Sequence, residues 1–148
     1  MKNLALIICL FGTTLGACSN DIPIAEVPSV VLNTFQTDFP AAKKLEWEKI
    51  KGNYEVEFEL NGIEQHAQFA TDGRKLMHKK EIPEGSLPAV ISSLLKDQFS
   101  SYLIDDVQQV MRAEITYYQV ELERKGKPDR KIVFSADGKE NSALPYWD

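Results

Sequence analysis

The feature that most constrains the fold of this chain is a stretch that occurs twice. Residues 54–74 read YEVEFELNGIEQHAQFATDGR, and residues 118–139 read YQVELERKGKPDRKIVFSADGK. Both copies open with Tyr-x-Val-Glu and close with Phe-(Ala/Ser)-x-Asp-Gly followed by a basic residue. Two copies of one pattern at this separation predict that the chain contains a duplicated structural unit.

The first copy predicts a β-hairpin. Apolar and acidic residues alternate over residues 54–60, as in a strand with one buried face and one solvent-exposed face. Asn61-Gly62 follows, and this dipeptide suits a two-residue turn in which both residues need a positive φ. A two-residue loop sets the expected pairs as Tyr54–Phe69, Val56–Ala67, Phe58–Gln65 and Leu60–Ile63.

A proline-led helix is expected before each set of strands. Residues 27–31 read VPSVV and residues 87–91 read LPAVI, an offset of sixty. The offset grows only in connections, between Tyr102 and Tyr118 and in the turn at 125–129, as a structural duplication should show. We therefore predict an α+β fold of two tandem units, 27–82 and 83–148, each with a helix on an antiparallel sheet of about four strands.

The N-terminal segment has the pattern of an export signal. Lys2 precedes a mostly apolar run that is too short to span a bilayer comfortably. The run ends in Leu15-Gly16-Ala17-Cys18, which resembles the bacterial lipobox. This resemblance implies a signal peptide over 1–17, a lipid on Cys18 that attaches the protein to a membrane, and a polar tether over 18–26. The alternative is an ordinary secretory signal with a chance cysteine.

Charge and cysteine content narrow the function classes. The formal net charge of −5 argues against a nucleic-acid partner, which usually requires a basic face. The only cysteines are Cys9 and Cys18, so a chain cleaved before Cys18 would have no disulfide and no free thiol. Ser19 directly after the cysteine resembles a sorting signal for the outer membrane.

The polar face of the two hairpins is the candidate binding surface. Strand alternation places on it the residues Glu55, Glu57, Glu59, Glu64, His66, Tyr117, Gln119, Glu121 and Glu123. We expect this face to be open and, because it is rich in carboxylates, to suit a basic protein or peptide. The apolar tail at residues 144–148 is expected to dock on the body or to pack against a sheet edge.

No residue pattern indicates catalysis, a metal or a cofactor. With His66 and His78 as the only histidines and no ligand spacing between them, zinc is not expected. Neither serine pair, at 92–93 or 100–101, has the glycines of a nucleophile elbow. The Asp-Gly pairs are explained by turn chemistry and lie in no calcium-binding series.

The order of these motifs resembles a known family. A proline-led helix, the Phe39-Pro40 end, the strand of Trp47, the Tyr-x-Val strand and the Phe-x-x-Asp-Gly turn are similar to the PepSY-like family, and in particular to its tandem β-lactamase-inhibitor-like lipoproteins from Bacteroidetes. The resemblance covers about residues 27–141. It implies helices against a curved four-stranded sheet, repeated twice, and a role in binding or inhibiting envelope enzymes. The second unit departs from the pattern, with Ser100 in place of Pro40 and no second tryptophan.

Three functional hypotheses follow. The first is a non-enzymatic envelope lipoprotein, in the periplasm or at the cell surface, that binds a protein or peptide through the sheet face. The family resemblance implies that such binding inhibits a peptidase or another hydrolase. The second is an accessory or structural envelope protein without inhibitory activity. The third is a small hydrolase, which the missing catalytic pattern disfavours.

Overall fold

The computed structural model describes residues 21–148, so the expected signal peptide and Cys18 lie outside the described residues. Along these described residues, two short 3-10 helices, two α-helices and seven strands follow one another. Their bounds are η1 Ile24–Glu26, α1 Ser29–Asp38, β1 Lys43–Ile50, β2 Asn53–Leu60, β3 Ile63–Phe69, β4 Lys75–Glu81, η2 Glu84–Ser86, α2 Ala89–Gln98, β5 Leu103–Arg112, β6 Ile115–Glu123 and β7 Arg130–Ser135.

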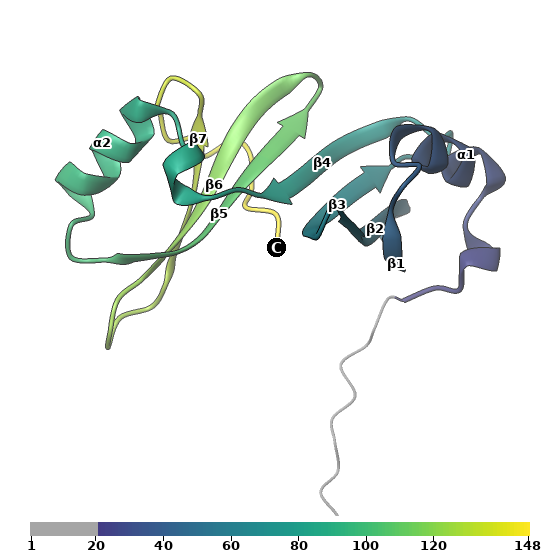
Figure 1. Ribbon diagram of the computed structural model, residues 1–148, viewed down its shortest axis with the longest axis horizontal. Helices are drawn as coiled ribbons and strands as arrows, with labels where there is room; N and C mark the ends of the chain where they lie inside the picture. The colour runs from purple at the N-terminus through teal and green to yellow at the C-terminus, as the bar shows by residue number, and fades with distance from the viewer. Residues whose placement is uncertain (1–20) are drawn as a thin grey trace, which may run out of the picture.

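All seven strands form one antiparallel sheet in chain order, which confirms the predicted α+β class and the tandem arrangement. The first unit contributes four strands and the second unit three. After β7 the chain makes one isolated bridge, between Phe134 and Glu140, and leaves the sheet instead of adding an eighth strand. The pairing of β4 with β5 joins the two units into a single surface (Figure 1).

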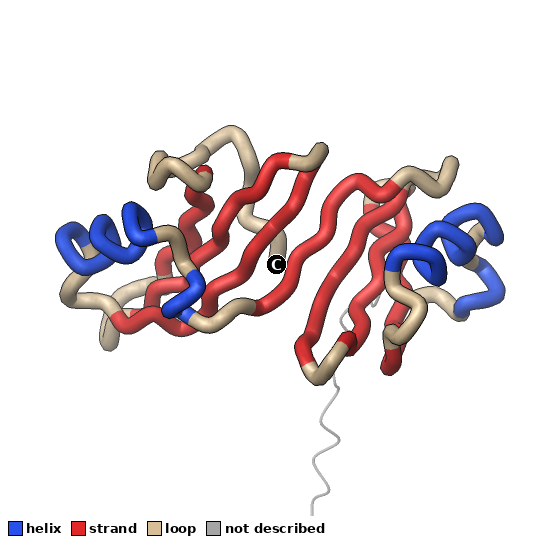
Figure 2. The backbone as a smooth tube through the Cα atoms, turned by 45° about the horizontal axis from the view of Figure 1, so that its top comes forward, coloured by secondary structure: helices blue, strands red, loops and turns tan. Residues whose placement is uncertain are grey.

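The two helices lie at opposite ends of the molecule and cover the same face of the sheet (Figure 2). Ala67, His78 and Met111 are neighbours in consecutive strand pairs, so their side chains share one face. Ala67 belongs to the core beneath α1, while Val107, four residues from Met111 along β5, belongs to the core beneath α2. We call this the helix side of the sheet and the opposite side the outer face.

The helices are equivalent in length and in their ends, and each follows its expected proline. Each has ten residues, preceded by Pro28 or Pro88 and followed by Phe39 or Phe99. The substitution of Ser100 for Pro40 does not lengthen the second helix. Phe99 donates its backbone N–H to Leu95 at 2.9 Å, as Phe39 does to Phe35 at 2.8 Å.

The pairing within the first hairpin confirms all four predicted pairs. The preceding strand departs from simple alternation of buried and exposed residues at one position. Leu45 is exposed rather than buried, because the pairing of β1 with β2 shifts between Lys43 and Glu46, where Lys44 has a φ of 54°. This bulge turns the start of β1 away from the core, while Trp47 remains buried.

Each helix packs on its own aromatic or aliphatic core. The first core is dominated by rings, with Phe35 in contact with Trp47, Phe58 and Phe69 at centroid distances of 5.1–6.3 Å. The second core lacks a tryptophan and has Val107 at the place of Trp47. Its buried members are Leu87, Ile91, Leu95, Phe99, Val107, Val120, Leu122, Ile132 and Phe134.

The predicted tether covered residues 18–26, but its described part, residues 21–26, packs against the fold. Asp21 forms a bridge with Glu48, and the backbone N–H of Ile22 donates to the carbonyl of Trp47 at 2.8 Å. Ile82 makes the equivalent bond to Val107 at 3.0 Å. The duplicated unit therefore begins at Ile22-Pro23, which Ile82-Pro83 repeats at an offset of sixty.

The Asp-Gly turns hold the helices against the sheet. Gly73 has a φ of 86°, and a Cβ built there would lie 2.7 Å from Val30 Cγ2 and 3.0 Å from the Val30 carbonyl oxygen. A Cβ on Gly138 would lie 2.9 Å from Val90 Cγ2. The glycine in each turn thus serves both the left-handed backbone and the close approach of the helix.

His78 lies on the helix side of the sheet, in contact with rings of the first core. Its ring is 5.0 Å from the Phe39 ring, and its Nε2 lies 2.8 Å from Gln65 Oε1, which accepts a hydrogen bond. Burial, together with the nearby positive charges of Lys75 and Lys80, lowers the pKa of His78 to about 4. The histidine is therefore neutral at pH 7 and serves packing.

A first prediction concerns acid stability. His78 titrates near its ordinary pKa of 6.5 in the unfolded chain and near 4 in the folded chain. The unfolded state therefore binds more protons between these values, and stability is present above about pH 6.5 and is lost as the pH falls toward 4. Allowing for partial exposure, we expect about 2 kcal/mol from this residue.

Urea unfolding of the parent, His78→Gln and His66→Gln across this pH range checks the prediction. The His78 variant should lose the larger part of the dependence between about pH 6.5 and 4. The His66 variant should lose a smaller part, because burial lowers the pKa of His66 in the same direction. An identical pH dependence in the parent and His78→Gln would contradict the assignment.

Candidate binding face

The strand pairing gathers the predicted site residues on one side of the sheet, the outer face. Because β4 pairs with β5, this face runs without interruption across both units. One row of paired residues crosses it from β1 to β7: Glu46, Glu57, His66, Lys79, Val110, Tyr117 and Ser135. Glu55, Glu59 and Glu64 flank this row in the first unit, and Gln119, Glu121 and Glu123 flank it in the second.

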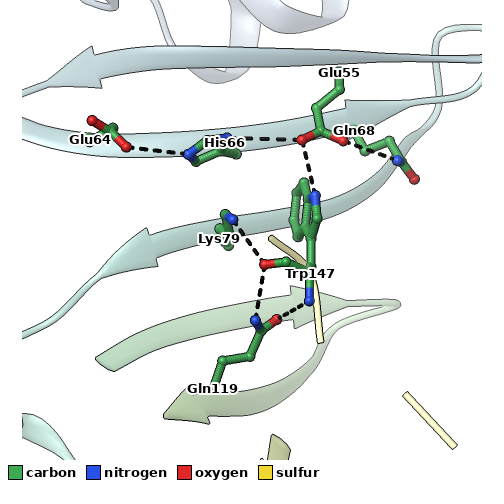
Figure 3. A network of polar contacts seen from close by, with 7 residues as sticks. All are labelled: Glu55, Glu64, His66, Gln68, Lys79, Gln119 and Trp147. Atoms are coloured by element: carbon green, nitrogen blue, oxygen red, sulfur yellow. Dashed lines mark hydrogen bonds and ion pairs between the residues drawn. The ribbon is translucent and has the colours of Figure 1, made fainter. Parts of the chain in front are cut away.

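The expectation that this whole face is open is wrong at its centre. The C-terminal segment Leu144–Asp148, here called the tail, lies on the outer face and not on a sheet edge. Figure 3 shows Trp147 of the tail between Glu55 of the first unit and Gln119 of the second. Beneath it Glu55 is 8% exposed and Gln119 is fully buried, although both were expected to face solvent.

Trp147 is held by hydrogen bonds from both units of the fold. Its indole N–H donates to Glu55 Oε1 at 3.0 Å, and its backbone N–H donates to Gln119 Oε1 at 3.2 Å. Its carbonyl oxygen accepts from Gln119 Nε2 at 3.0 Å and from Lys79 Nζ at 2.9 Å. The Lys79 Nζ also lies 5.2 Å from the centre of the indole ring, within cation–π range.

Burial changes the electrostatics of the groups around Trp147. It raises the pKa of Glu55, while the hydrogen bonds from Trp147 and Gln68 and the charge of Lys79 oppose the rise. Burial also lowers the pKa of Lys79, with Glu55 opposing. Glu55 lies at the N–H of the indole and Lys79 lies over its ring, and the charge of each favours the charged form of the other.

His66 joins this network as a neutral ring. Burial and then the charge of Lys79 lower its pKa, against the raising effect of Glu64. Its Nδ1 lies 3.9 Å from Glu55 and its Nε2 lies 3.5 Å from Glu64. Because the ring is neutral at pH 7, these contacts are polar contacts rather than ion pairs.

The rest of the tail covers apolar residues of the second unit. Val110 and Val133 are 1% and 5% exposed, yet neither belongs to the helix-side cores. Leu144 is buried as well, and a cavity of about 990 Å³ beside the tail is lined by Val110, Leu144 and Trp147 among others. Lys131 holds the end of the tail through an ion pair with Asp148 and a 5.0 Å approach to the Tyr146 ring.

Outside the tail, the first unit presents a cluster of carboxylates that we call the acidic ladder: Glu46, Glu48, Glu57, Glu59 and Glu64. Glu46 pairs with Glu57, and Glu59 pairs with Glu64, so like charges lie directly opposite one another. Burial, followed by repulsion from Glu64 and Glu46, raises the pKa of Glu57. Lys44 compensates only Glu59, at 2.7 Å. Within residues 21–148, no lysine or arginine forms an ion pair with Glu57 or Glu64.

Within the described residues, one set of three side chains is spaced closely enough to bind a metal ion. Single oxygen or nitrogen atoms of Glu57, Glu64 and His66 lie within 4.8 Å of one another. Exposed carboxylates often gather in this way on one strand face without holding an ion, and no buried polar group supports a site here. We therefore do not assign a metal site to these three residues.

Two contributors to this face were missed in the sequence. Lys79 follows from the alternation of β4, since its neighbours His78 and Lys80 point to the helix side. Trp147 was visible only as part of an apolar tail, and its position depends on partners 28 and 92 residues away.

A second prediction concerns the tail as part of the fold. Trp147→Ala should lower the free energy of unfolding by about 3 kcal/mol, because it removes the ring that covers Glu55 and Lys79. Trp147→Phe keeps a ring but removes the indole N–H, and should cost about 1 kcal/mol. Urea melts with Leu103→Ala as an exposed control test this; a Trp147→Ala loss as small as the control's would contradict the packing.

Among the described residues, no helix is long and apolar enough to cross a membrane.

No curated protein matches the chain. Solved structures share its fold. A "putative periplasmic" protein from Bacteroides eggerthii has a TM-score of 0.73 at 19% identity, covering 77% of this chain and 85% of its own.

A DUF2874 family protein from Bacteroides uniformis gives a TM-score of 0.71 at 17% identity, covering 76% of this chain and 85% of its own. A BLIP-like protein from Bacteroides fragilis gives 0.66 at 20% identity, covering 81% and 92%. The sequence itself matches the family described as "Putative beta-lactamase-inhibitor-like, PepSY-like" over residues 16–74 and 52–140. These two segments together span most of the chain, which therefore belongs to the PepSY-like family.

Proposed function

We propose that this protein is a non-enzymatic binding module that captures a basic segment of another protein or peptide on its acidic ladder. The observation that carries the proposal is the repulsion around Glu57, which faces Glu46 across one strand pair, has Glu64 as a further like-charged neighbour, and forms no ion pair with a lysine or arginine of the described residues. Like charges held opposite one another destabilise a sheet, and a cationic partner would relieve that repulsion.

The architecture supports the same role. The helices bury one side of the sheet, and the tail covers the centre of the other side, so the ladder is the regular, charged surface left to solvent in the first unit. Family membership supports an inhibitor-like binding module, in keeping with the family's description. The likeness to a BLIP-like protein supports the fold on which such a module is built.

A second candidate is an accessory or structural role in the envelope without inhibition. The observation that favours it is the tail itself, which occupies the middle of the surface with an internal segment. A search for partners in detergent-solubilised envelope separates the two candidates, because only the binding module requires one stoichiometric partner.

The ladder can be tested with charge-matched variants. In the first variant, the ladder variant, Glu46, Glu57 and Glu64 are changed to Gln. In the second variant, the control, an equal number of charges is removed by changing the exposed residues Glu26, Glu84 and Glu114 to Gln. The ladder variant should bind the captured partner at least about tenfold more weakly at low salt, while the control variant binds like the parent. Association with the parent should slow as salt rises.

Each outcome has a clear reading when binding is measured across a salt series and circular dichroism verifies the folds. Equal binding by the ladder variant and the parent would move the site away from β1–β3. Weakening of both variants to the same degree would indicate a response to net charge rather than to the ladder.

We further propose that the protein is attached to the outer membrane through a lipid on Cys18. The lipobox-like sequence supports this, and the fold adds a geometric consequence. From Cys18 to Asp21, which pairs with Glu48 of β1, the chain can extend at most about 11 Å. The sheet edge at β1 would then lie close to the bilayer, with the acidic ladder beside it.

Cys18→Ala tests the attachment. The variant should fold like the parent, because the described domain begins at residue 21, but it should leave the membrane fraction. Metabolic labelling with a fatty-acid analogue should tag the parent and not the variant. Equal labelling of both forms would remove the lipid from the proposal.

A further inference from the structure

The tail lies in a site built from buried polar side chains. We call this site the tail groove and define it by Glu55, Lys79, Gln119 and Lys131. The first three are 8%, 3% and 0% exposed, and each forms at least one hydrogen bond with Trp147. The tail contributes to this burial, and a buried charge or amide without a partner is costly. A segment that replaces the tail therefore has to offer a matching pattern of donors and acceptors.

The groove recognises main chain as well as side chain. The amide of Gln119 contacts both the N–H and the carbonyl of Trp147, as a neighbouring strand would, and Lys79 adds a second donor to that carbonyl. Any extended peptide offers these main-chain groups. Glu55 and the Lys79 ammonium then select an aromatic residue with an N–H donor, which is tryptophan.

The next position selects an acidic residue. Lys131 forms an ion pair with the carboxylate of Asp148, which follows Trp147 in the sequence. The same ammonium lies over the ring of Tyr146, which precedes Trp147. Burial raises the pKa of Tyr146, with Asp106 and Glu121 adding to the effect, so its hydroxyl stays neutral. The pattern held by the groove is therefore aromatic, tryptophan, acidic.

In the described structure, no backbone–backbone hydrogen bond holds the tail on the sheet. After Asn141, whose N–H donates to the Val133 carbonyl at 2.7 Å, residues 142–148 make no backbone–backbone hydrogen bond in the described structure. The equivalent residues of the first unit instead form β4, with a ladder on both sides. The hydrogen bonds that hold Trp147 therefore all involve side chains of the sheet, and the adjoining cavity of about 990 Å³ leaves room beside the tail.

We propose that the tail groove is a peptide-binding site for an extended segment of a partner protein in which an acidic residue follows tryptophan, and that this segment displaces the tail. The proposal rests on the proposed function in placing a partner on the outer face. It uses different residues from the acidic ladder, so each can fail alone.

Displacement can be followed in the intact chain by fluorine NMR. The chain has only two tryptophans, so 5-fluorotryptophan gives two signals, assigned with Trp147→Phe. The probe is the unlabelled synthetic peptide Ser-Ala-Leu-Pro-Tyr-Trp-Asp. At millimolar peptide the Trp147 signal should move toward the position of solvent-exposed tryptophan while the Trp47 signal stays, because an attached tail competes at an effective concentration in the millimolar range.

Direct binding uses the full chain with Trp147→Ala, which vacates the groove, and a dye-labelled form of the same peptide. Fluorescence anisotropy should show affinity at least about tenfold tighter than for the parent. A peptide with alanine in place of tryptophan should lose at least about tenfold. Adding Gln119→Leu or, separately, Lys79→Met to the Trp147→Ala chain should remove binding, with circular dichroism as the check on folding.

Three results would overturn the proposal. These are no movement of the Trp147 signal together with no binding to folded Trp147→Ala, equal binding of the alanine peptide, and dimerisation of the parent with rising concentration, which would assign the groove to the tail of a second copy. The ladder variant, in which Glu55 is intact, should bind the peptide unchanged. Loss of partner capture by that variant with peptide binding retained separates the two sites.

Discussion

The pairing of β4 with β5 is the interaction on which the rest of the structure depends. Five residue pairs, from Met77–Arg112 to Glu81–Gln108, turn two small units into one sheet. Because side chains alternate along a strand, this pairing also decides that both helices cover the same side. Every property of the outer face, including the place where the tail lies, follows from that shared orientation.

The duplication shows how one local pattern leads to two different outcomes. In both units a proline starts the helix, an Asp-Gly turn approaches the helix, and an Ile-Pro segment pairs with the first strand. In the first unit the chain after the Asp-Gly turn forms β4, which has partners on both sides. In the second unit the described residues after the Asp-Gly turn form no further strand, and the corresponding segment crosses the outer face instead.

Charge is distributed unevenly over that face. The first unit carries the acidic ladder, where burial and then repulsion from Glu64 and Glu46 raise the pKa of Glu57. The centre holds the buried pair of Glu55 and Lys79 around an indole. A solvated carboxylate ladder interacts weakly with each counter-charge but steers a cationic partner over distance. A buried pair acts at contact and selects geometry. The two regions therefore suit different parts of a partner.

The sequence by itself determined the local structure. Alternation and the Asn61-Gly62 turn predicted the first hairpin with its register, and repeated prolines predicted both helices, because these patterns act between residues close in the chain. Only the tertiary structure decided that Glu55 and Gln119 are buried, that Leu45 is exposed beside a bulge, and that residues 21–26 belong to the fold. The bulge and the burial depend on the path of the whole sheet and on a tail whose partners lie up to 92 residues away, which no pattern within a strand encodes.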